Sequence, residues 1–261
     1  MKYNPSKTEK KKSGSRRLCA LVFVKAPEKG KVKTRLSKII GNEIALNVYK
    51  RFALDLIETL KNIECNITIC YHPSHAKSCI TRWLGNSYTF FAQKGNNIGK
   101  RMANAFIRSF SKGFHRVILV GVDIPDLTEK IIDEAFSGLQ KYPAVIGPAI
   151  DGGYYLIGFN ADTFIPDVFE DIPWGTDRVH EKTLTVFDKK RIQVHMLPIW
   201  RDIDTYEDLV RFYKINRKNR SAAQNTISYL AHIDIGRFEN RIISRGEKNG
   251  KLLSFGRPAK I

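Results

Sequence analysis

Short apolar runs alternate along this 261-residue chain with longer segments whose apolar residues recur at helical spacing. Leu18–Val24 is a continuous apolar run, which is typical of a strand buried on both faces. In residues 42–62, Ile44, Val48 and Phe52 share one helical face. Such alternation predicts an α/β domain with a mostly parallel sheet covered by helices on both sides. We expect strands at residues 18–24, 66–71, 88–92, 116–123, 144–149, 154–159 and 192–197, and helices at 42–62, 74–84, 96–110, 127–141, 176–190 and 205–216.

The basic charge of the chain is concentrated at its two ends. The formal net charge is +18, but residues 1–17 hold seven Lys and Arg against one Glu, and residues 214–261 hold eleven against three acids. Residues 18–213 therefore carry only the remaining +4. A domain built to bind nucleic acid would show its basic excess on the folded face. We expect one domain at 18–213, a disordered basic segment at 1–17 and a basic C-terminal extension at 214–261, with flexible tails that contact nucleic acid weakly at most.

The cysteines and the absence of a long apolar run indicate a cytoplasmic protein without a membrane span. No run approaches the roughly 20 apolar residues that a membrane helix needs, and the N-terminus lacks the apolar stretch of a secretory signal. A zinc site is conceivable because His72 and His75 lie among three cysteines, but the spacing matches no common pattern. We interpret the cysteines as free thiols in a reducing compartment, since they form no CxxC pair: Cys19, Cys65, Cys70 and Cys79.

A strongly basic segment, VKAPEKGKVKTRL, follows the first predicted strand. It is not a Walker A loop, because Lys25 stands where the first Gly belongs and Val32 replaces the Ser or Thr that would hold magnesium. Flexible cations and an Arg fork after a strand suit a diphosphate. We expect Lys25, Lys33 and Arg35 to bind nucleotide phosphates, whereas a solvated surface loop is the alternative and accounts well for Lys29 and Lys31.

Three aspartates are candidate ligands for Mg²⁺ or Mn²⁺. Asp123 ends the apolar strand Arg116–Asp123, where an unpartnered carboxylate would be costly. Magnesium prefers one or two carboxylates together with substrate phosphate. Asp202 and Asp204 lie two residues apart, so an extended segment places them on one face. The alternative for Asp204 is a capping box with Glu207 at the start of the next helix.

Two further segments contain candidate binding residues. Asp151, Gly152 and Gly153 form a tight turn that could be an ordinary hairpin or could let a ligand approach the backbone. Trp174 could stack on a base or a sugar. Gly99 and Arg101 lie at the start of a predicted helix, where an anion could bind, although an ordinary loop explains them equally well.

Six motifs occur together in an order that resembles a known family. They are FVKAPEKGKVKTRL, QKGNNIGKRM, GVDIPDL, IGPAIDGGYYLIGF, PWGT and RDIDTYEDL. Over residues 18–213 the chain resembles GT-A-type nucleotide-diphospho-sugar transferase-like proteins, known as radical-SAM/selenodomain-associated transferases or arsenosugar-biosynthesis glycosyltransferases. It is more distantly similar to 2-phospholactate and molybdenum-cofactor guanylyltransferases.

The resemblance implies a fold and a set of roles for matching residues. It implies a single Rossmann-like three-layer GT-A domain with a mostly parallel mixed sheet. Lys25, Lys33 and Arg35 would bind phosphates, Asp123 would bind the metal with Asp202 or Asp204, and residues 151–158 would lie near the acceptor or sugar. The chain departs from the family pattern at Val122 and Ile124, at Asn97, and at Gly175.

These observations lead us to expect a metal-dependent glycosyltransferase that uses a nucleotide diphosphate sugar and a small-molecule acceptor. Catalysis would involve Asp123, Asp151 and Arg35, with Arg35 stabilising the charge of the leaving group. The second expectation is nucleotidylyl transfer from an NTP to a phosphorylated acceptor, because five cations are generous for a diphosphate. A third is an inactive scaffold of this fold that binds RNA through its basic tails.

Overall fold

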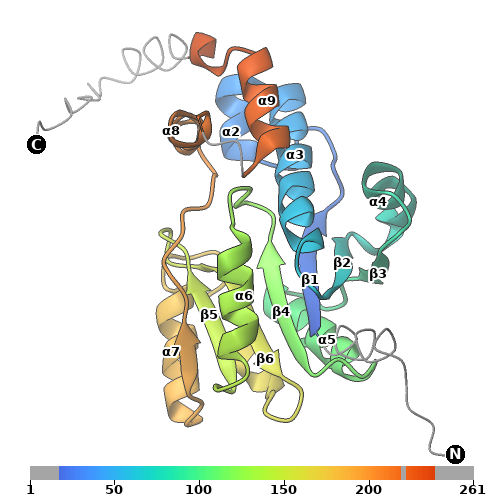
Figure 1. The fold of residues 1–261 in the computed structure, drawn as a ribbon, viewed down its shortest axis with the longest axis vertical. Helices are drawn as coiled ribbons and strands as arrows, with labels where there is room; N and C mark the ends of the chain where they lie inside the picture. The colour runs from blue at the N-terminus through green and yellow to red at the C-terminus, as the bar shows by residue number, and fades with distance from the viewer. Residues whose placement is uncertain (1–17, 219–221, 239–261) are drawn as a thin grey trace, which may run out of the picture.

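The computed structural model describes residues 18–218 and 222–238, which form one seven-stranded sheet with helices packed around it (Figure 1). The strand order is β3-β2-β1-β4-β6-β5-β7. The basic segment expected at 1–17 and the part of the C-terminal extension after residue 238 lie outside the described residues. The strands are β1 (Leu18–Lys25), β2 (Asn66–His72), β3 (Thr89–Ala92), β4 (Arg116–Gly121), β5 (Ala144–Pro148), β6 (Tyr154–Asn160) and β7 (Val194–Met196).

The sheet is mostly parallel with one antiparallel strand. β1 is parallel to both β2 and β4, β2 is parallel to β3, and β5 is parallel to β7. β6 runs antiparallel to its neighbours β4 and β5. Only a short turn separates β5 from β6, and a connection of that length cannot make the crossover that a parallel pair needs. The expected mostly parallel, mixed α/β sheet is confirmed.

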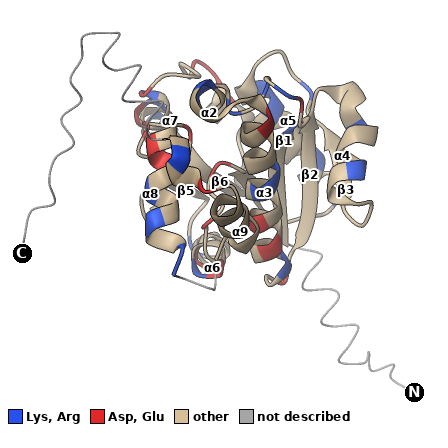
Figure 2. Cartoon of the chain, turned by 90° about the horizontal axis from the view of Figure 1, so that it is seen from above, with Lys and Arg blue, Asp and Glu red and all other residues tan. Residues whose placement is uncertain are grey.

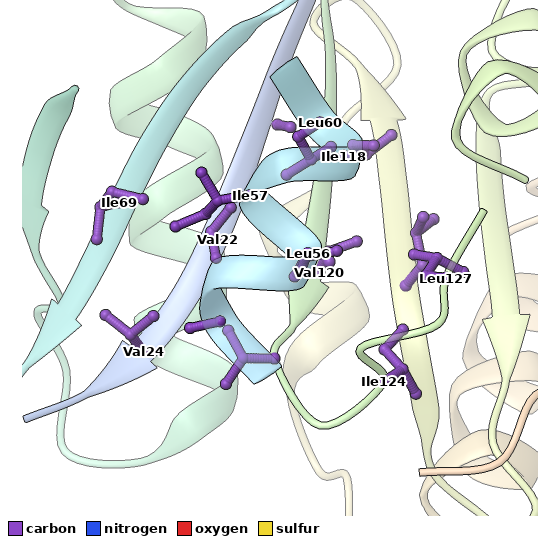
Figure 3. Close-up of a cluster of buried hydrophobic side chains, with 14 of the residues drawn as sticks. Val22, Val24, Leu56, Ile57, Leu60, Ile69, Ile118, Val120, Ile124 and Leu127 are labelled. Atoms are coloured by element: carbon purple, nitrogen blue, oxygen red, sulfur yellow. The ribbon is translucent and has the colours of Figure 1, made fainter. Parts of the chain in front are cut away.

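Helices cover both faces of the sheet and complete three layers. One face carries α3 (Asn42–Lys61), α4 (Lys77–Leu84) and α6 (Glu129–Gly138), and the other carries α5 (Ile98–Phe110) and α7 (Val179–Lys189). Figure 3 shows Leu56, Ile57 and Leu60 of α3 packed on strand residues such as Val22 and Val120. The opposite layer is built on aromatic rings, with Phe106 of α5 edge-on to Phe159 of β6 at 5.0 Å. These buried apolar faces are the main source of stability.

A third cluster lies beyond one end of the sheet. It joins α2 (Thr34–Ile40), part of α3, α8 (Tyr206–Asn216) and α9 (Gln224–His232), which gather at the top of Figure 1. Leu36, Phe52, Leu209 and Leu230 are buried there. The packed structure therefore continues past residue 213, where we expected the domain to end, because α9 buries its apolar face on α3 and α8.

A buried carboxylate ties α9 to α3. Asp55 of α3 is 4% exposed and accepts hydrogen bonds from the backbone N–H and the side chain of both Asn225 and Thr226. These donors belong to the first turn of α9, whose N–H groups have no partner within the helix. Burial raises the pKa of Asp55, and the four donors act in the opposite direction. Asp55 thus caps a helix that is 170 residues away in sequence.

Several helix ends differ from the sequence expectations. The capping box of α8 joins Thr205 to Asp208 rather than Asp204 to Glu207. Helix α7 begins at Val179, three residues later than expected. The basic segment is not entirely a loop, because α2 begins inside it at Thr34. This last difference determines where the side chain of Lys33 points.

The described elements show no broad face of one charge in the view of Figure 2, where basic and acidic residues are intermixed. This mixture agrees with the low net charge of residues 18–213 in the sequence. Within the described part of the chain, no helix is both long enough and apolar enough to cross a membrane.

Candidate active site

A cavity of about 420 Å³ opens at the C-terminal ends of β1 and β4. The chain order runs outward from β1 to β2 and β3 on one side, while β4 pairs on the other side. The cavity therefore lies at the point where the strand order reverses, which is the usual ligand crevice of open α/β sheets. Its wall includes Lys25 from β1, Lys33 and Arg35 from the basic segment, Arg101 from α5 and Asp123 from the end of β4.

Lys33 is the most constrained cation of this cavity. Its backbone is left-handed, with φ and ψ both 47°, and it immediately precedes α2. Its side chain is 4% exposed, and its Nζ lies 2.6 Å from Asp123 Oδ1 and 2.8 Å from Asp204 Oδ1. The same ammonium donates to the carbonyl oxygen of Ile203. One buried lysine therefore joins the basic segment, the end of β4 and the segment before α8.

The pKa values of Lys33 and Asp204 are shifted by their contact. Burial alone would lower the pKa of Lys33, but the carboxylates of Asp123 and Asp204 outweigh it and raise that pKa. Burial would raise the pKa of Asp204, and Lys33 together with Arg35 lowers it instead. The ammonium and the Asp204 carboxylate therefore remain charged over the neutral range.

Other cations of the basic segment are open to solvent or to the cavity. Arg35 is 72% exposed, and its Nη1 lies 3.6 Å from Asp204 Oδ2. The side chains of Lys29 and Lys31 are exposed and form surface ion pairs with Glu43 and Glu28. Lys31 nevertheless lines the cavity, and Lys29 does not. The arrangement leaves Arg35 free to turn its guanidinium towards a ligand.

Three further polar side chains, from Tyr49, His72 and Gln93, complete this wall. The hydroxyl of Tyr49 accepts from the backbone N–H of Lys25 and donates to its carbonyl oxygen, which holds the start of the basic segment. Gln93 donates to the carbonyl oxygen of Cys70 at 2.8 Å. His72 lines the cavity, and its buried Nδ1 has no hydrogen-bond partner among the described residues. Burial and the nearby cations lower the pKa of His72. Only contacts between distant strands reveal these residues, so periodicity could not find them.

A second cavity of about 200 Å³ adjoins the first and has the opposite charge. Asp123 and Asp204 line both cavities, and Asp151 and Asp202 line only the second. The expectation that Asp202 and Asp204 share a face therefore agrees with the structure. Burial, followed by repulsion from Asp151 and Asp204, raises the pKa of Asp202 to about 6. Four carboxylates thus line this one cavity.

The fit of a divalent cation can be judged from these carboxylates. No three His, Cys, Asp or Glu side chains in the described residues converge as a ready group of metal ligands. The Lys33 ammonium lies between two of the three expected ligands, Asp123 and Asp204. The three expected ligands, Asp123, Asp202 and Asp204, still line one cavity. Magnesium is commonly held by one or two carboxylates plus substrate phosphate. The donor set therefore fits a cation that arrives with a nucleotide rather than one held by the protein alone.

Two of the expected binding residues lie away from both cavities. Gly99 packs against Trp174, and a Cβ on Gly99 would come within 2.7 Å of the Trp174 ring and of the Phe169 carbonyl oxygen. Trp174 itself packs against Phe169 and Tyr154. Neither Gly99 nor Trp174 lines the cavities at the strand ends. Their place in the structure is explained by close packing between α5 and the 166–174 segment.

The Asp151-Gly152-Gly153 turn is fixed by its neighbours. Asp151 accepts from the N–H of Gly153, and the carbonyl oxygen of Gly152 accepts from the N–H of His180. Gly152 has φ of +87°, and a Cβ there would lie 1.9 Å from the carbonyl oxygen of Asp177. Only glycine fits this position. The turn is both a hairpin connection and a wall of the second cavity, so the two interpretations of the sequence are compatible.

Comparisons with known proteins identify relatives of this chain. The family described as "Uncharacterized protein conserved in bacteria (DUF2064)" matches residues 55–176. A solved structure of a putative nucleotide-diphospho-sugar transferase from Desulfovibrio desulfuricans G20 is 41% identical, covers 85% of this chain and 98% of its own, and superimposes with a TM-score of 0.80. No curated protein matches the sequence.

Two more distant structures share the fold. A nucleotidyl transferase from Methanothermobacter thermautotrophicus is 13% identical with a TM-score of 0.51, and the match covers 78% of this chain and 99% of the other. A 4-diphosphocytidyl-2C-methyl-D-erythritol synthase from Anaerococcus prevotii is 13% identical with a TM-score of 0.50, covering 75% and 96%. At this level of identity the likeness concerns the fold alone.

Proposed function

The chain belongs to the GT-A-like family of nucleotide-diphospho-sugar transferases that includes the Desulfovibrio desulfuricans protein, and from this premise we propose that it transfers a glycosyl group from a nucleotide diphosphate sugar to a small-molecule acceptor. One observation carries the proposal. Lys25, Lys31, Lys33, Arg35 and Arg101 line a single cavity at the strand ends, and this cavity meets a carboxylate-lined one at Asp123 and Asp204.

The basic cavity suits the diphosphate of the donor. Arg35 is exposed and can bind two phosphate oxygens at once, as its planar fork allows. Lys25 and Arg101 add positive charge from two other elements. Because the diphosphate gains negative charge as the sugar bond breaks, cations already in position favour the transition state over the bound donor.

Mg²⁺ or Mn²⁺ is the cofactor that this donor set would accept. Asp123, with Asp202 or Asp204, would hold the cation beside the phosphates. When bound, such a cation acts as a Lewis acid that neutralises the leaving diphosphate. The chain's own residues orient the carboxylates, since Lys33 forms ion pairs with both Asp123 and Asp204.

The acceptor would occupy the second cavity. Asp151 and Asp202 lie on that side and form no ion pair in the part of the chain that the structure describes. A carboxylate there can take the proton that the acceptor loses as it attacks. We assign this role to Asp151 or Asp202, while Asp123 and Arg35 act on the leaving group.

Nucleotidylyl transfer is the second candidate, and the number of cations favours it. Five basic side chains at one cavity could hold a triphosphate, with pyrophosphate as the leaving group and a phosphorylated acceptor as the nucleophile. A product assay separates the two candidates. Nucleoside diphosphate released from a nucleotide sugar supports glycosyl transfer, and pyrophosphate released from an NTP supports nucleotidylyl transfer.

The function is tested first by ligand binding. A thermal-shift panel of nucleotides and nucleotide sugars, with and without Mn²⁺, should identify the donor, because a ligand at a hundredfold its Kd adds about 2.7 kcal/mol of stability. In Asp123→Asn the enhancement of nucleotide affinity by Mn²⁺ should collapse, and turnover with it. The exposed carboxylate of Asp133, which lines neither cavity, supplies the matched control, Asp133→Asn. A wild-type Mn²⁺ enhancement in Asp123→Asn would show that Asp123 is not a metal ligand.

A further inference from the structure

The two adjoining cavities differ sharply in charge. Five Lys and Arg side chains line the first, while the second is lined by four aspartates and by no Lys, Arg or His. This negative cavity belongs to a chain whose formal net charge is +18, so it runs against the overall excess. We propose that the acceptor of the reaction is an uncharged or cationic molecule that offers hydroxyl or amine groups, and that an acceptor with a phosphate or carboxylate at its reacting end is rejected. The inference rests on the proposed function and specifies its acceptor.

The hydrogen-bonding groups of the second cavity support this choice. The carboxylates of Asp151 and Asp202 can only accept hydrogen bonds when ionised. Tyr155 already donates its hydroxyl to the Pro198 carbonyl oxygen at 3.0 Å, and the Tyr154 hydroxyl is directed to the sulfur of Met102 at 3.9 Å. The side chains of the cavity therefore offer acceptors and few donors. A hydroxyl or an ammonium group matches them, whereas a phosphate would face them with acceptors only.

The negative charge is not cancelled by the cations of the site. Lys33 pairs with Asp123 and Asp204, and Arg35 lies 3.6 Å from Asp204, so these cations act on the two aspartates that both cavities share. Asp151 and Asp202 line only the second cavity and form no ion pair among the described residues, so this side of the cavity stays negative. A charged acceptor of the same sign would lose its water shell without gaining a partner, which is the usual basis of rejection at charged sites.

The walls of the second cavity are held in place by backbone hydrogen bonds. The N–H of Ile150 donates to the Trp200 carbonyl oxygen at 3.1 Å, which fixes the Asp151 turn to the segment that leads to Asp202. The N–H of Ile203 donates to the Asp123 carbonyl oxygen at 2.9 Å, which fixes that segment to the end of β4. The cavity is therefore formed before any ligand arrives. Its volume of about 200 Å³ is below the roughly 300 Å³ at which drug-sized pockets begin, so it accepts a small molecule or the end of a larger one.

The group-transfer step balances with this acceptor. A lone pair of a hydroxyl oxygen, or of an amine nitrogen that has first given up its ammonium proton, forms the new bond to the anomeric carbon of the donor. The bond from that carbon to the diphosphate oxygen breaks, and its electron pair leaves with the nucleoside diphosphate. The proton of the acceptor passes to a carboxylate of the second cavity and from there to solvent.

Charged thiol reagents test the sign of the cavity without knowledge of the acceptor. Ala149 lines the second cavity and not the first, so Ala149→Cys places a thiol inside it. The exposed native thiol is removed by Cys79→Ser. The rates of modification by a cationic and an anionic methanethiosulfonate of similar size give a ratio that does not depend on the thiolate fraction. Should Ala149→Cys fail to fold, Gly153→Cys supplies a second position whose φ lies outside the left-handed region.

The reference is the ratio of the cationic to the anionic rate with N-acetylcysteine amide. We expect this ratio to be about tenfold or more higher at the cavity thiol, since local potentials of this kind reach several kT. Adding Asp151→Asn should reduce the preference severalfold. Equal rates, or a preference for the anionic reagent, would overturn the proposal, because the cavity would then not be negative.

Acceptor turnover is the second measurement, made with the full chain, Mn²⁺ and the donor found by thermal shift. Acceptors are compared in matched sets that differ only in bearing a hydroxyl, an amine or a phosphate at one position. Turnover of hydroxyl or amine members at least tenfold above the phosphate member supports the proposal, and preferred turnover of the phosphate member overturns it. Should no nucleotide bind at all, the proposed function fails, while the thiol ratio still decides the charge of the cavity.

Discussion

Replacing Lys33 with methionine tests the buried ammonium that joins three parts of the site. Methionine keeps the apolar length of the side chain and removes the charge, the donors and the cation–π contact of Nζ, which lies 5.5 Å from the Phe52 ring centre. The Asp123 and Asp204 carboxylates then face each other without the cation that lies between them. We expect the variant to fold but to lose stability and nucleotide affinity together.

The magnitude follows from the exposure of the partners. Removing one member of a fully buried ion pair typically costs about 3–5 kcal/mol. The Asp123 side chain is 47% exposed and that of Asp204 is 35% exposed, so water can partly solvate both after the change. We therefore expect a loss of about 2–3 kcal/mol in the free energy of unfolding. For a chain of this size that corresponds to a fall in Tm of roughly 4–12 °C.

The assay is denaturant unfolding with a control from the same segment. Lys31→Met removes a 75% exposed lysine that pairs with Glu28 on the surface, and it should leave the midpoint of unfolding almost unchanged. The double variant Lys33→Met/Asp204→Asn removes one of the two facing carboxylates and should regain at least about 1 kcal/mol over Lys33→Met.

The pH dependence of the stability difference between wild type and Lys33→Met is a second test of these ion pairs. The pKa of Asp204 is lowered in the folded protein from its ordinary 3.8, so Asp204 contributes stability above that value and loses it as the pH falls through the lowered pKa. The pKa of Lys33 is raised above 10.5, so its contribution persists across the neutral range. The gap between wild type and Lys33→Met should therefore be constant near neutrality and close below about pH 4. Equal stability of Lys33→Met and wild type at pH 7 would refute the reasoning, because the desolvation of the lysine would then cancel its ion pairs.

Three more variants separate binding from structure. Arg35→Ala should weaken nucleotide binding about tenfold or more by titration and change the stability of the unliganded protein by less than about 1 kcal/mol, since its side chain is 72% exposed; a drop of several kcal/mol would make Arg35 structural. Asp55→Ala should cost about 3–5 kcal/mol in urea unfolding, because it leaves the N–H and the hydroxyl of Thr226 buried without their partner, whereas exposed Glu58→Ala on the same helix should cost little. Gly152→Ala should cost more than Gly175→Ala, whose φ is also positive but which has open space at its Cβ; equal costs of about 1–2 kcal/mol in the two would mean that the Asp177 backbone yields.

Much of the fold follows from patterns that need only local sequence. The uninterrupted apolar run of β1 identifies a strand that is buried on both faces. The helical spacing of Leu56 and Leu60 identifies α3 as a helix that is buried on one face. Alternation of such elements restricts the architecture to a covered, mostly parallel sheet, and the resemblance of the motifs identifies the family. The short α2 escapes prediction, because it is seven residues long and begins inside a basic segment. The extent of the folded part is also missed, since only contacts over 170 residues show Asp55 capping α9.

The sequence predicts which residues line the candidate site, but it does not predict the contacts that they make with each other. Sequence reasoning places Lys33, Asp123 and Asp204 at one edge of the sheet, and all three line one cavity. It assigns Lys33 to phosphate and both carboxylates to metal, but the left-handed backbone at Lys33 turns its side chain away from solvent and onto the carboxylates. Asp126, which is not among the expected site residues, accepts from Trp200 Nε1 at 3.0 Å and from Asn216. These are contacts between distant segments that spacing along the chain cannot reveal.

The position of Lys33 bears on how strongly the expected metal site binds a cation before nucleotide is present. A carboxylate cluster that waited without a cation would repel itself, and Asp202 shows part of that repulsion in its raised pKa. Lys33 relieves the repulsion between Asp123 and Asp204, because its buried ammonium pairs with both carboxylates. The pair can therefore be held in place before the donor binds, and a divalent cation with two phosphates then completes a site that the protein alone leaves partly neutralised. On this reasoning metal affinity should be weak without nucleotide and strong with it, because the substrate supplies the missing ligands.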